Sequence, residues 1–435
     1  MTQSQYDKCL AEMFGLRRFG IKLGLDIIDA MLKALGRPER KFACIHVAGT
    51  NGKGSIASAL AAILQTAGLR VGLYTSPHLV RFNERICINN QYISDHEVVN
   101  AWHAAKAAAP KEREATFFEY TTAMALYAFA RAEVDWAVIE TGMGGRMDAT
   151  NILQPRLCII SNISLEHRFY LGSTIAQITG EKAGIIKPDT PVITGVHQKS
   201  AIEVIEKTAA RNNAPVFRKG KDFRIRRSPK SDAGNFGFTY KGIDHKWTDM
   251  RSSLQGIHQL DNAALVLAAC EVLMDQGTAI DVSRIKDGLA NVRWPGRLEM
   301  IDTTPPMILN GAHNLIAARR LAAFLSDTAA DKNITLVIGI LDDKPCQAML
   351  NTLVPLCQRV IVTRPVIDRS LPARVIEAGV KKLTDHVEIV ESVRDAVFYA
   401  METTANTDLI CVAGSLYVVG EAKAALEGAR APEPV

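Results

Sequence analysis

The sequence predicts an α/β fold with two domains, a larger one that binds phosphate and a smaller one that follows it. Short apolar, β-rich runs alternate with helical patterns from residue 42 onward, and a glycine-rich loop joins the first such run to a helix-forming run. The alternation restarts after a proline and a glycine at residues 295 and 296. Such alternation is typical of βαβ units, whose parallel sheets bind ligands at the carboxyl ends of the strands. We therefore predict a P-loop, parallel-sheet domain over residues 1–296 and a smaller, Rossmann-like α/β domain over residues 297–435.

In the first domain, strands and helices are expected to alternate along the chain. Strands are predicted at residues 42–47, 71–75, 136–140, 157–163, 191–194 and 215–217, and helices at 55–67, 119–132 and 200–212. Residues 223–250 alternate polar and apolar side chains, which predicts an antiparallel ribbon. Two further helices, at 258–276 and 282–290, complete this domain.

The second domain begins after residues 293–297, where Pro295 and Gly296 predict a break that can act as a hinge. Strands are expected at residues 307–309, 334–339, 360–363, 387–390 and 409–412, and helices at 314–326, 346–353, 372–382 and 392–403.

Composition limits the class of protein. A chain of 435 residues is too long for one ordinary core, and its apolar and charged fractions of 48% and 22% are those of a soluble globular protein. With no basic segment followed by a long apolar run near its start and no stretch fit to span a bilayer, we expect a cytoplasmic monomer that does not enter a membrane. The eight cysteines are dispersed without C-x-x-C spacing, so we expect reduced, buried thiols.

The net charge of +5 is modest, and its densest cluster lies at residues 218–230. A nucleic-acid patch is one interpretation of this cluster, but its Ser, Gly and Asp content favours the solvated charge of a loop or hairpin. We therefore expect small anionic substrates and no nucleic acid.

The most informative segment reads HVAGTNGKGS over residues 46–55. Glycines allow close backbone approach, so several N–H groups and the positive end of the following helix can meet one phosphate. Lys53 adds a point charge and the Ser55 hydroxyl can reach a magnesium ion. The spacing is a variant, since Val47 stands at the usual first glycine and Gly54 precedes Ser55. The alternative is a tight turn that merely ends a strand, but the flanking strand and helix favour a nucleotide site.

Three polar side chains follow other predicted strands at the same edge of the sheet: Ser76, Glu140 and His167. Glu140 could cap a turn, yet a carboxylate closing a buried strand is costly unless a cation or donor meets it. His167 could equally be a loop histidine, because magnesium prefers oxygen ligands. Together they suggest a magnesium site.

Lys182 lies in a helical segment between Gly180 and Gly184. The simplest expectation is an ion pair with a carboxylate. The alternative is a deprotonated, chemically modified lysine, because burial of an ammonium lowers its pKa.

These residues belong to a larger set of ordered motifs: AGTNGKGS at 48–55, TSPHL at 75–79, RFNERI at 81–86, TFFE at 116–119, ETGMGGRMDATN at 140–151, EKAGI at 181–185, PGRLE at 295–299 and GSLY at 414–417. With these motifs the sequence resembles folylpolyglutamate synthase, including the bifunctional form that is also dihydrofolate synthase, within the Mur-ligase-like superfamily. The resemblance covers nearly the whole chain.

The resemblance implies an ATP-dependent ligase that uses Mg²⁺ and joins L-glutamate to folate or dihydropteroate through an acyl phosphate. It implies catalytic roles for Lys53, Lys182 and His313, with Lys182 carbamylated, and metal binding by Ser76, Glu140 and His167. The nucleotide would be bound by Gly49, Thr50, Asn51, Gly52, Lys53, Gly54, Ser55, Asn262, Arg297 and Asn310. The pterin would be bound by Leu23, Gly24, Leu25, Asp26, Phe117, Phe118, Glu119, Tyr120, Met147, Asp148 and Ala149.

Two other functions stay open on the sequence. One is a Mur-like amide ligase with a different acceptor, such as a cell-wall precursor. The other is an inactive nucleotide-binding homologue, since Asn310 stands where the family usually has aspartate and Arg168 follows His167 where threonine is usual.

Overall fold

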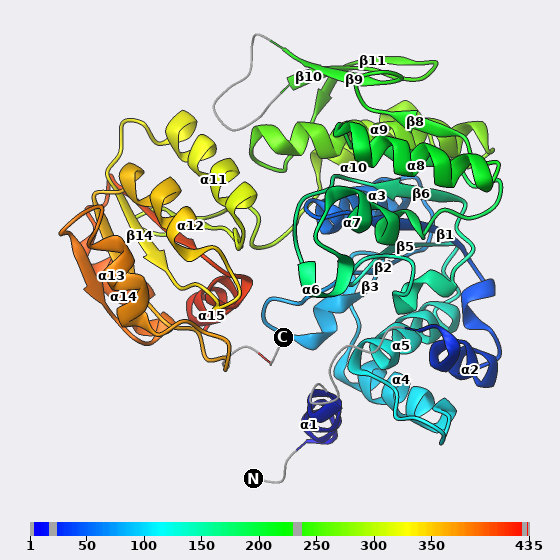
Figure 1. Cartoon of the computed structure of the whole chain (residues 1–435), viewed down its shortest axis with the longest axis horizontal. Coiled ribbons are helices and arrows are strands. Elements are labelled where there is room, and N and C mark those ends of the chain that lie inside the picture. Colours follow the sequence, from blue (N-terminus) through cyan, green and yellow to red (C-terminus); the bar gives the residue numbers. More distant parts are fainter. Residues whose placement is uncertain (1–3, 17–23, 229–236, 429–432, 434–435) are drawn as a thin grey trace.

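The structure is a computed structural model, and it describes residues 4–16, 24–228, 237–428 and 433. The chain forms two lobes (Figure 1). The larger lobe holds every described strand up to residue 251, and the smaller lobe holds the described strands from residue 299 onward. The mixed α/β class with parallel sheets is confirmed, while the division at residues 296 and 297 stays a prediction.

A mainly parallel sheet forms the centre of the larger lobe. Its eight described strands run in the order β4-β3-β2-β5-β1-β6-β7-β8. The six neighbouring strands β2-β5-β1-β6-β7-β8 are parallel, whereas β3 pairs antiparallel with β2 and β4 pairs antiparallel with β3. The strands are β1 (Ala43–Ala48), β2 (Val71–Tyr74), β3 (Ile86–Ile88), β4 (Gln91–Tyr92), β5 (Trp136–Glu140), β6 (Leu157–Ile160), β7 (Val192–Thr194) and β8 (Val216–Arg218). The central strands are almost wholly apolar because helices bury both faces of the sheet.

Helices cover both faces of this sheet and create two large cores, one against α3, α9 and α10 and one against α2, α4 and α5. The helices of this lobe are α1 (Gln5–Gly15), α2 (Asp26–Ala34), α3 (Lys53–Thr66), α4 (Asp95–Ala108), α5 (Phe117–Arg131), α6 (Arg168–Leu171), α7 (Ile175–Ala183), α8 (Lys199–Arg211), α9 (Ile257–Asp275) and α10 (Val282–Ala290), with short 3₁₀ turns η2 (Pro38–Arg40), η3 (Phe82–Arg85) and η4 (Ala149–Ile152). Among the described helices, α9 is long and apolar enough to cross a membrane, but 78% of its apolar window is buried, as in a core helix.

The predicted ribbon at residues 223–250 is a three-stranded antiparallel sheet above α9, made of β9 (Arg224–Arg227), β10 (Gly237–Lys241) and β11 (Lys246–Arg251) (Figure 1). Glu271 of α9 anchors it, because the buried Glu271 carboxylate accepts hydrogen bonds from the Tyr240 hydroxyl and from the backbone of the β10–β11 turn.

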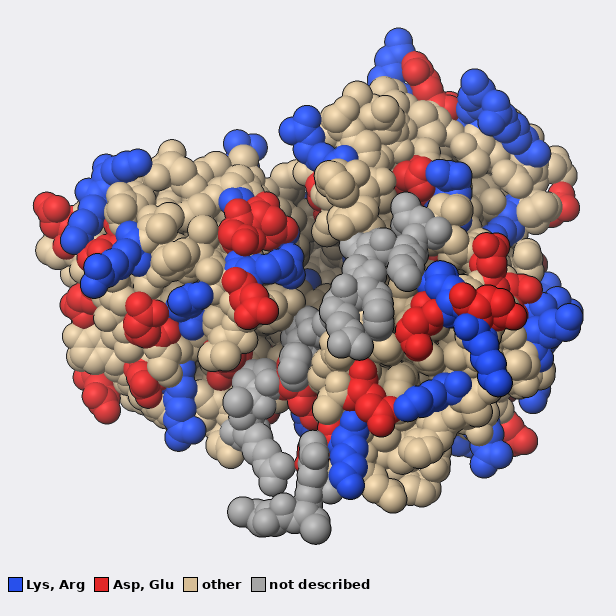
Figure 2. Space-filling view, turned by 60° about the horizontal axis from the view of Figure 1, so that its bottom comes forward, with Lys and Arg blue, Asp and Glu red and all other residues tan. Residues whose placement is uncertain are grey.

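In the basic cluster at residues 218–230, Arg218 pairs with Glu206 and Lys219 pairs with Asp261. Lys230 lies outside the described residues. On the face shown in Figure 2, Lys and Arg are interspersed with Asp and Glu over both lobes. These two ion pairs and the mixed surface fit the interpretation as solvated charge.

The smaller lobe contains a second, mainly parallel sheet in the order β12-β13-β17-β14-β15-β16, with β12 antiparallel to β13. Its strands are β12 (Glu299–Ile301), β13 (Met307–Leu309), β14 (Ile334–Ile338), β15 (Arg359–Val362), β16 (Val387–Ile389) and β17 (Leu409–Ala413), and its helices are α11 (Leu315–Thr328), α12 (Cys346–Leu353), α13 (Ala373–Val380), α14 (Val393–Thr403) and α15 (Leu416–Leu426), with the 3₁₀ turn η5 (Val354–Leu356). The cysteines of both lobes are free, and six of the eight are buried, as predicted.

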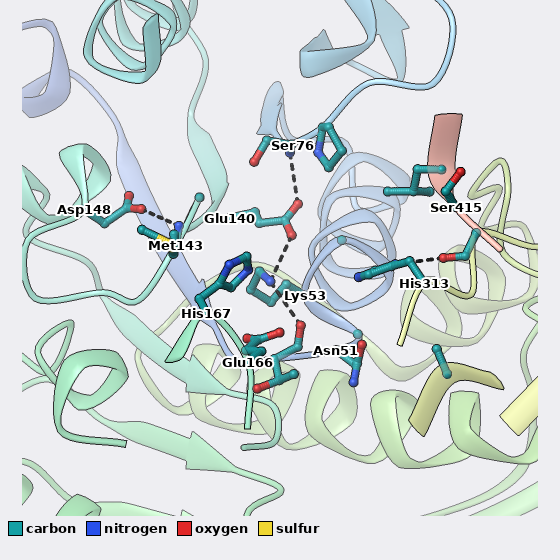
Figure 3. A pocket seen from close by; sticks show the side chains of 18 of the residues that line it. Asn51, Lys53, Ser76, Glu140, Met143, Asp148, Glu166, His167, His313 and Ser415 are labelled. Atoms are coloured by element: carbon teal, nitrogen blue, oxygen red, sulfur yellow. Dashed lines mark hydrogen bonds and ion pairs between the residues drawn. The ribbon is translucent and has the colours of Figure 1, made fainter. Parts of the chain in front are cut away.

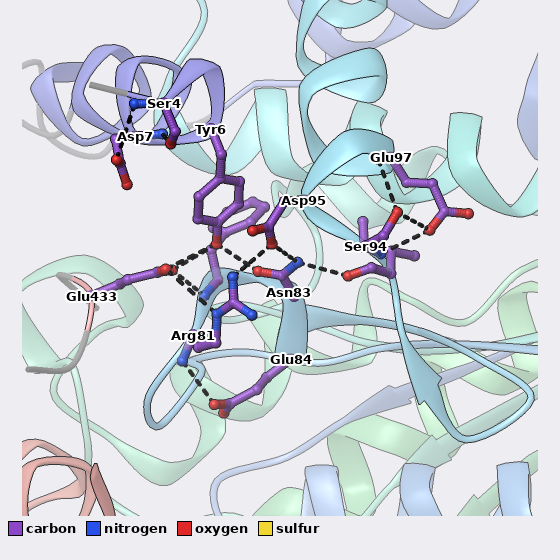
Figure 4. A network of polar contacts seen from close by, with 12 residues as sticks. Ser4, Tyr6, Asp7, Arg81, Asn83, Glu84, Ser94, Asp95, Glu97 and Glu433 are labelled. Atoms are coloured by element: carbon purple, nitrogen blue, oxygen red, sulfur yellow. Dashed lines mark hydrogen bonds and ion pairs between the residues drawn. The ribbon is translucent and has the colours of Figure 1, made fainter. Parts of the chain in front are cut away.

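Residue Glu433 lies against the larger lobe (Figure 4). Its carboxylate accepts hydrogen bonds from the Tyr6 hydroxyl at 2.9 Å and from the Phe82 backbone N–H at 2.5 Å. Its own N–H donates to the Val80 carbonyl at 2.8 Å. These contacts hold the start of the chain, the loop after β2 and residue 433 together beside the cleft described next.

Candidate active site

One deep cleft of about 800 Å³ lies between the lobes and contains most of the predicted site residues. The larger lobe contributes the loops at the carboxyl ends of β1, β2, β5 and β6, which meet at one edge of the sheet. The smaller lobe contributes residues 310–313, Leu341, Lys344, Arg369 and residues 415–417. The cleft therefore has a phosphate-loop wall and a separate wall that belongs to the second sheet.

The packing around the phosphate loop explains why the spacing of its glycines differs from the usual pattern. Gly52 precedes α3 with a φ of 87°, a conformation that favours glycine. A Cβ on Gly52 would lie 2.5 Å from Asn262 Oδ1, and one on Gly54 would lie 2.6 Å from Trp294 Cζ2. The inserted Gly54 is therefore required by the hinge tryptophan that packs over it.

Lys53 and Glu140 face each other in the floor of the cleft (Figure 3). The Lys53 Nζ lies 3.3 Å from the Thr50 carbonyl, to which it donates, and 3.8 Å from Glu140 Oε1. The Ser76 backbone N–H donates to Glu140 Oε2 at 3.2 Å. Burial raises the pKa of Glu140 although Lys53 lowers it. Burial therefore disfavours the charged carboxylate, and a bound cation would stabilise it.

The donors at this point fit a magnesium ion. Glu140 and the Ser76 hydroxyl offer oxygen, and desolvation in the cleft lowers the pKa of His167, which keeps its imidazole neutral and able to bind metal. Across the described residues no three His, Cys, Asp or Glu side chains form a metal-binding group. A cation here would therefore need phosphate or water oxygens as well, which is the usual situation for magnesium.

Lys182 is 2% exposed and lies beneath the phosphate loop. Its Nζ donates to the Gly49 carbonyl at 2.8 Å and to Glu166 Oε1 at 3.0 Å. The predicted ion pair with a carboxylate is confirmed, and Glu166 is the partner. Burial lowers the pKa of Lys182 to about 8 even though Glu166 raises it. For Glu166, Lys182 and Lys53 outweigh burial and lower the pKa.

Residues expected at the nucleotide line the same cleft from both lobes. On α9, Asn262 Nδ2 donates to Gln259 Oε1 at 2.7 Å, and Gln259 lies 3.4 Å from Ser55 Oγ. On the smaller lobe, Arg297 Nη1 donates to the Gly311 carbonyl at 3.2 Å. Asn310 is buried at the edge of this wall.

His313 belongs to this wall of the smaller lobe. Its Nδ1 is 2.9 Å from the Gly311 carbonyl and so carries the proton. Burial and Arg297 lower the pKa of His313 to about 4. The imidazole is therefore neutral at pH 7, with a lone pair on Nε2.

The predicted pterin segments reach the cleft only in part. Gly24, Phe117, Phe118, Glu119, Met147, Asp148 and Ala149 line it. Asp148 shapes its own loop, because its carboxylate accepts from the Met143 and Thr150 backbone N–H groups at 2.8 and 3.0 Å. Leu23 lies outside the described residues.

Four predicted residues do not line the cleft. Tyr120 is turned into the core, where its ring lies 4.9 Å from that of Trp102 and its hydroxyl donates to Glu114. It follows Glu119 on α5, and neighbouring helix positions point in different directions. Leu25 and Asp26 begin α2 away from the cleft, and Gly49 contributes a carbonyl to Lys182 from behind the loop.

The sequence reasoning missed several charged residues that line the cleft. They are Arg85, Arg320, Lys344 and Arg369, and the neutral Gln259 also lines the cleft without having been predicted. Arg85 stands inside the RFNERI motif, so the motif itself was a signal. Lys344 follows β14, and the rule that ligands bind beyond strand ends could have identified it.

Comparisons with known proteins agree with this geometry. Residues 47–270 match the Mur ligase middle domain and residues 296–416 match the Mur ligase glutamate ligase domain. The dihydrofolate synthase/folylpolyglutamate synthase of Bacillus subtilis is 35% identical over 97% of this chain and 99% of its own. The chain belongs to the folylpolyglutamate synthase family of the Mur ligases.

Solved structures of folylpolyglutamate synthases share the whole fold. The Mycobacterium tuberculosis enzyme complexed with ADP has a TM-score of 0.88 at 32% identity and covers 98% of this chain and 100% of its own. The Escherichia coli protein FolC in complex with DHPP and ADP has a TM-score of 0.89 at 27% identity, over 98% of this chain and 99% of its own. The two matched regions of the family fall on the two lobes that form the cleft.

Proposed function

We propose that the protein is an ATP-dependent ligase that adds L-glutamate to folates, and to dihydropteroate as well, with ATP and Mg²⁺ as its cofactors. The observation that carries the proposal is the cleft itself: it places a phosphate loop beside aromatic side chains on one lobe and beside a cationic wall on the other. A relative of known structure binds DHPP and ADP, which fits this division.

The reaction needs charge neutralisation and positioning more than covalent chemistry from the protein. The folate carboxylate attacks the γ-phosphorus of ATP, which gives an acyl phosphate and ADP. The amine of glutamate then attacks the acyl carbon, forms the amide and releases phosphate. The loop N–H groups at residues 52–55 and Lys53 Nζ offset the phosphate charge during the first step.

Ser76, Glu140 and His167 would hold the magnesium ion at the end of the phosphate loop. Bound there, the ion would neutralise charge on the phosphate oxygens. Glu140 is kept close to Lys53 by the backbone hydrogen bond from Ser76, so the floor of the cleft is prearranged for this charge.

Lys182 is proposed to become carbamylated. The ammonium first loses a proton, and the neutral amine then attacks carbon dioxide and releases a second proton, so that an anionic carbamate replaces the cation. The lowered pKa of about 8 supplies a larger neutral fraction at pH 7 than an exposed lysine has. In the unmodified protein, the ion pair with Glu166 holds the amine under the loop.

The smaller lobe is proposed to receive glutamate. Arg320, Lys344 and Arg369 line its side of the cleft and suit the two carboxylates of that substrate, which would share Lys344 and Arg369 with the neighbouring Asp343 carboxylate. His313 is neutral, so its Nε2 lone pair can accept a hydrogen bond from the incoming amine. Arg297 and Asn310 are proposed to contact ATP from the junction of the lobes. We expect the protein to work as a cytoplasmic monomer without nucleic acid or membrane.

The test is ADP release in the presence of ATP, Mg²⁺, L-glutamate and an acceptor, with dihydropteroate compared against tetrahydrofolate. Release should require all components, and Lys53→Ala should lower it by about a hundredfold or more, since it removes a charge that acts on the reacting phosphates. Lys381→Ala is the matched control, because Lys381 is 57% exposed and pairs only with Glu377 of its own helix among the described residues.

Each alternative has a distinct outcome. Release with a cell-wall precursor in place of folates would indicate a Mur-like ligase with another acceptor. Nucleotide binding without turnover on any acceptor would indicate an inactive homologue. Unchanged ADP release by Lys53→Ala would contradict the phosphate-loop assignment itself.

A further inference from the structure

The phosphate loop and the smaller lobe are joined by a direct side-chain hydrogen bond. Asn314 Nδ2, at the start of α11, donates to Asn51 Oδ1 in the loop at 3.1 Å. Asn51 lines the cleft from the larger lobe (Figure 3). Neither the phosphate chemistry of the loop nor the fold of the smaller lobe requires this bond, because each element has its own internal support.

The orientation of Asn314 is dictated by its helix. Asn314 is the N-cap of α11, and its Oδ1 accepts a hydrogen bond from the Ala317 backbone N–H at 2.8 Å. Since the oxygen is committed to the cap, only the amide nitrogen of Asn314 can face the loop. The helix of the smaller lobe therefore presents a donor to the larger one.

This donor in turn decides the orientation of Asn51. The Asn51 backbone is fixed from behind, because its N–H donates to Asn162 Oδ1 and its carbonyl accepts from Ser161 and Asn162. Its amide Nδ2 is buried and has no hydrogen-bond partner within the described chain. If the Asn51 amide were rotated by 180°, its Nδ2 would face the Nδ2 of Asn314, and two donors would meet. The hydrogen bond to Asn314 therefore fixes the observed orientation, although it leaves Asn51 Nδ2 without a partner among the described residues.

We propose that Asn314 is a positioning residue that couples the smaller lobe to the phosphate loop through Asn51. The next residue back, His313, lies on the glutamate side of the cleft, whereas Lys53 follows Asn51 by two positions on the phosphate side. The Asn51–Asn314 bond therefore sets the separation between the two reacting ends. The inference rests on the proposed ligase function, since that function gives the two ends their roles.

Asn314→Ser separates this role from helix capping, because serine caps a helix about as well as asparagine but is too short to reach Asn51. We expect kcat for ADP release to fall by about 10- to 100-fold through misplacement of the reacting groups, while the KM for ATP changes by less than about threefold. Ser392→Ala is the control. It removes the cap of α14, whose Ser392 Oγ accepts from Asp395, in a helix that contributes nothing to the cleft lining.

A double-mutant cycle with Asn51→Ala tests the route. If Asn314 acts through Asn51, Asn314→Ser should lower kcat in the parent but not in the Asn51→Ala background, while the dissociation constant of a fluorescent ADP analogue changes by less than about threefold on adding Asn314→Ser to either protein. The ADP analogue can be measured even where turnover is lost, and circular dichroism confirms folding of each variant.

Three results would overturn the proposal: an unchanged kcat in Asn314→Ser, a higher KM for ATP with unchanged kcat, or equal losses with and without Asn51. These differ from a failure of the proposed function, which would appear as a parent protein that binds the ADP analogue but releases no ADP with any acceptor.

Discussion

Lys182→Met replaces a buried ammonium with an apolar side chain of similar length, and its effect on stability should depend on pH. Burial lowers the pKa of Lys182 from 10.5 to about 8 in the folded protein. The difference between the two pKa values corresponds to about 3 kcal/mol of unfolding free energy.

The sign follows from proton binding. Above about pH 8 the folded protein releases the Lys182 proton, while the unfolded chain holds it up to about pH 10.5. The unfolded chain thus binds more protons in this interval, and the free energy of unfolding rises with pH. The destabilisation by Lys182 is about 3 kcal/mol at about pH 7 and about 1 kcal/mol at about pH 9.5, so the parent gains about 2 kcal/mol that Lys182→Met cannot gain.

Urea unfolding at the two pH values, in buffer free of carbon dioxide, measures this gain. The difference between parent and Lys182→Met cancels the titration of other groups, and the loss of the partners of Glu166 and the Gly49 carbonyl contributes equally at both pH values. Lys381→Met, at an exposed position, is the control and should show no such difference. If the free energies of parent and Lys182→Met differ by the same amount at both pH values, the buried ammonium does not titrate as argued.

Three other perturbations test separate parts of the structure. Gly54→Ala should destabilise the protein by about 1–3 kcal/mol and weaken ADP binding, because the new Cβ would lie 2.6 Å from Trp294 Cζ2. Gly180→Ala, with open space around the glycine, should be neutral or stabilising in the same urea titration. Glu140→Gln should raise the Mg²⁺ concentration for half-maximal ADP release by about tenfold or more, and an equal requirement in both proteins would argue against metal binding by Glu140. Glu271→Ala should lower the free energy of unfolding by about 3 kcal/mol in urea titration, because the Tyr240 hydroxyl and three backbone N–H groups lose their acceptor. The KM for ATP should stay unchanged. A changed KM would indicate that the three-stranded sheet contributes to the site.

Elements with a strong local pattern were predictable from the sequence. The strands at residues 136–140 and 307–309 and the helices at 282–290 and 346–353 have the expected bounds, because apolar runs and turn residues delimit them. The helices α1, α2 and α4 were missed: α1 and α2 lie before the first βα unit, and α4 follows only the two-residue strand β4. The helix α15 was missed although the GSLY motif contains its N-cap Ser415.

Site residues that directly follow a strand could be predicted from the sequence. Side-chain directions that depend on packing between distant elements could not. Ser76, Glu140 and Lys53 lie together because parallel strands end at one edge. The direction of Tyr120, by contrast, depends on the space left by Trp102, which belongs to another helix. The partner of Lys182 could be predicted as a carboxylate, but only the packing of α7 beneath the loop identifies Glu166.

The cleft contains buried cations whose charged forms are disfavoured in the protein without a ligand. Burial lowers the pKa of both Lys182 and Arg297, which means that the folded state without a ligand holds these cations at a cost. Within the described chain Arg297 donates to the Gly311 carbonyl, and Glu140 is the carboxylate that offsets its charge. Lys182 has Glu166 as its counter-charge, but a polyphosphate entering between the lobes would give Arg297 a further one and would thereby stabilise the arrangement of both lobes around it. We therefore expect the unfavourable burial to favour a polyanion in the site, and we expect residues that join the lobes, such as Arg297 and Asn314, to couple its binding to the relative position of the two substrates.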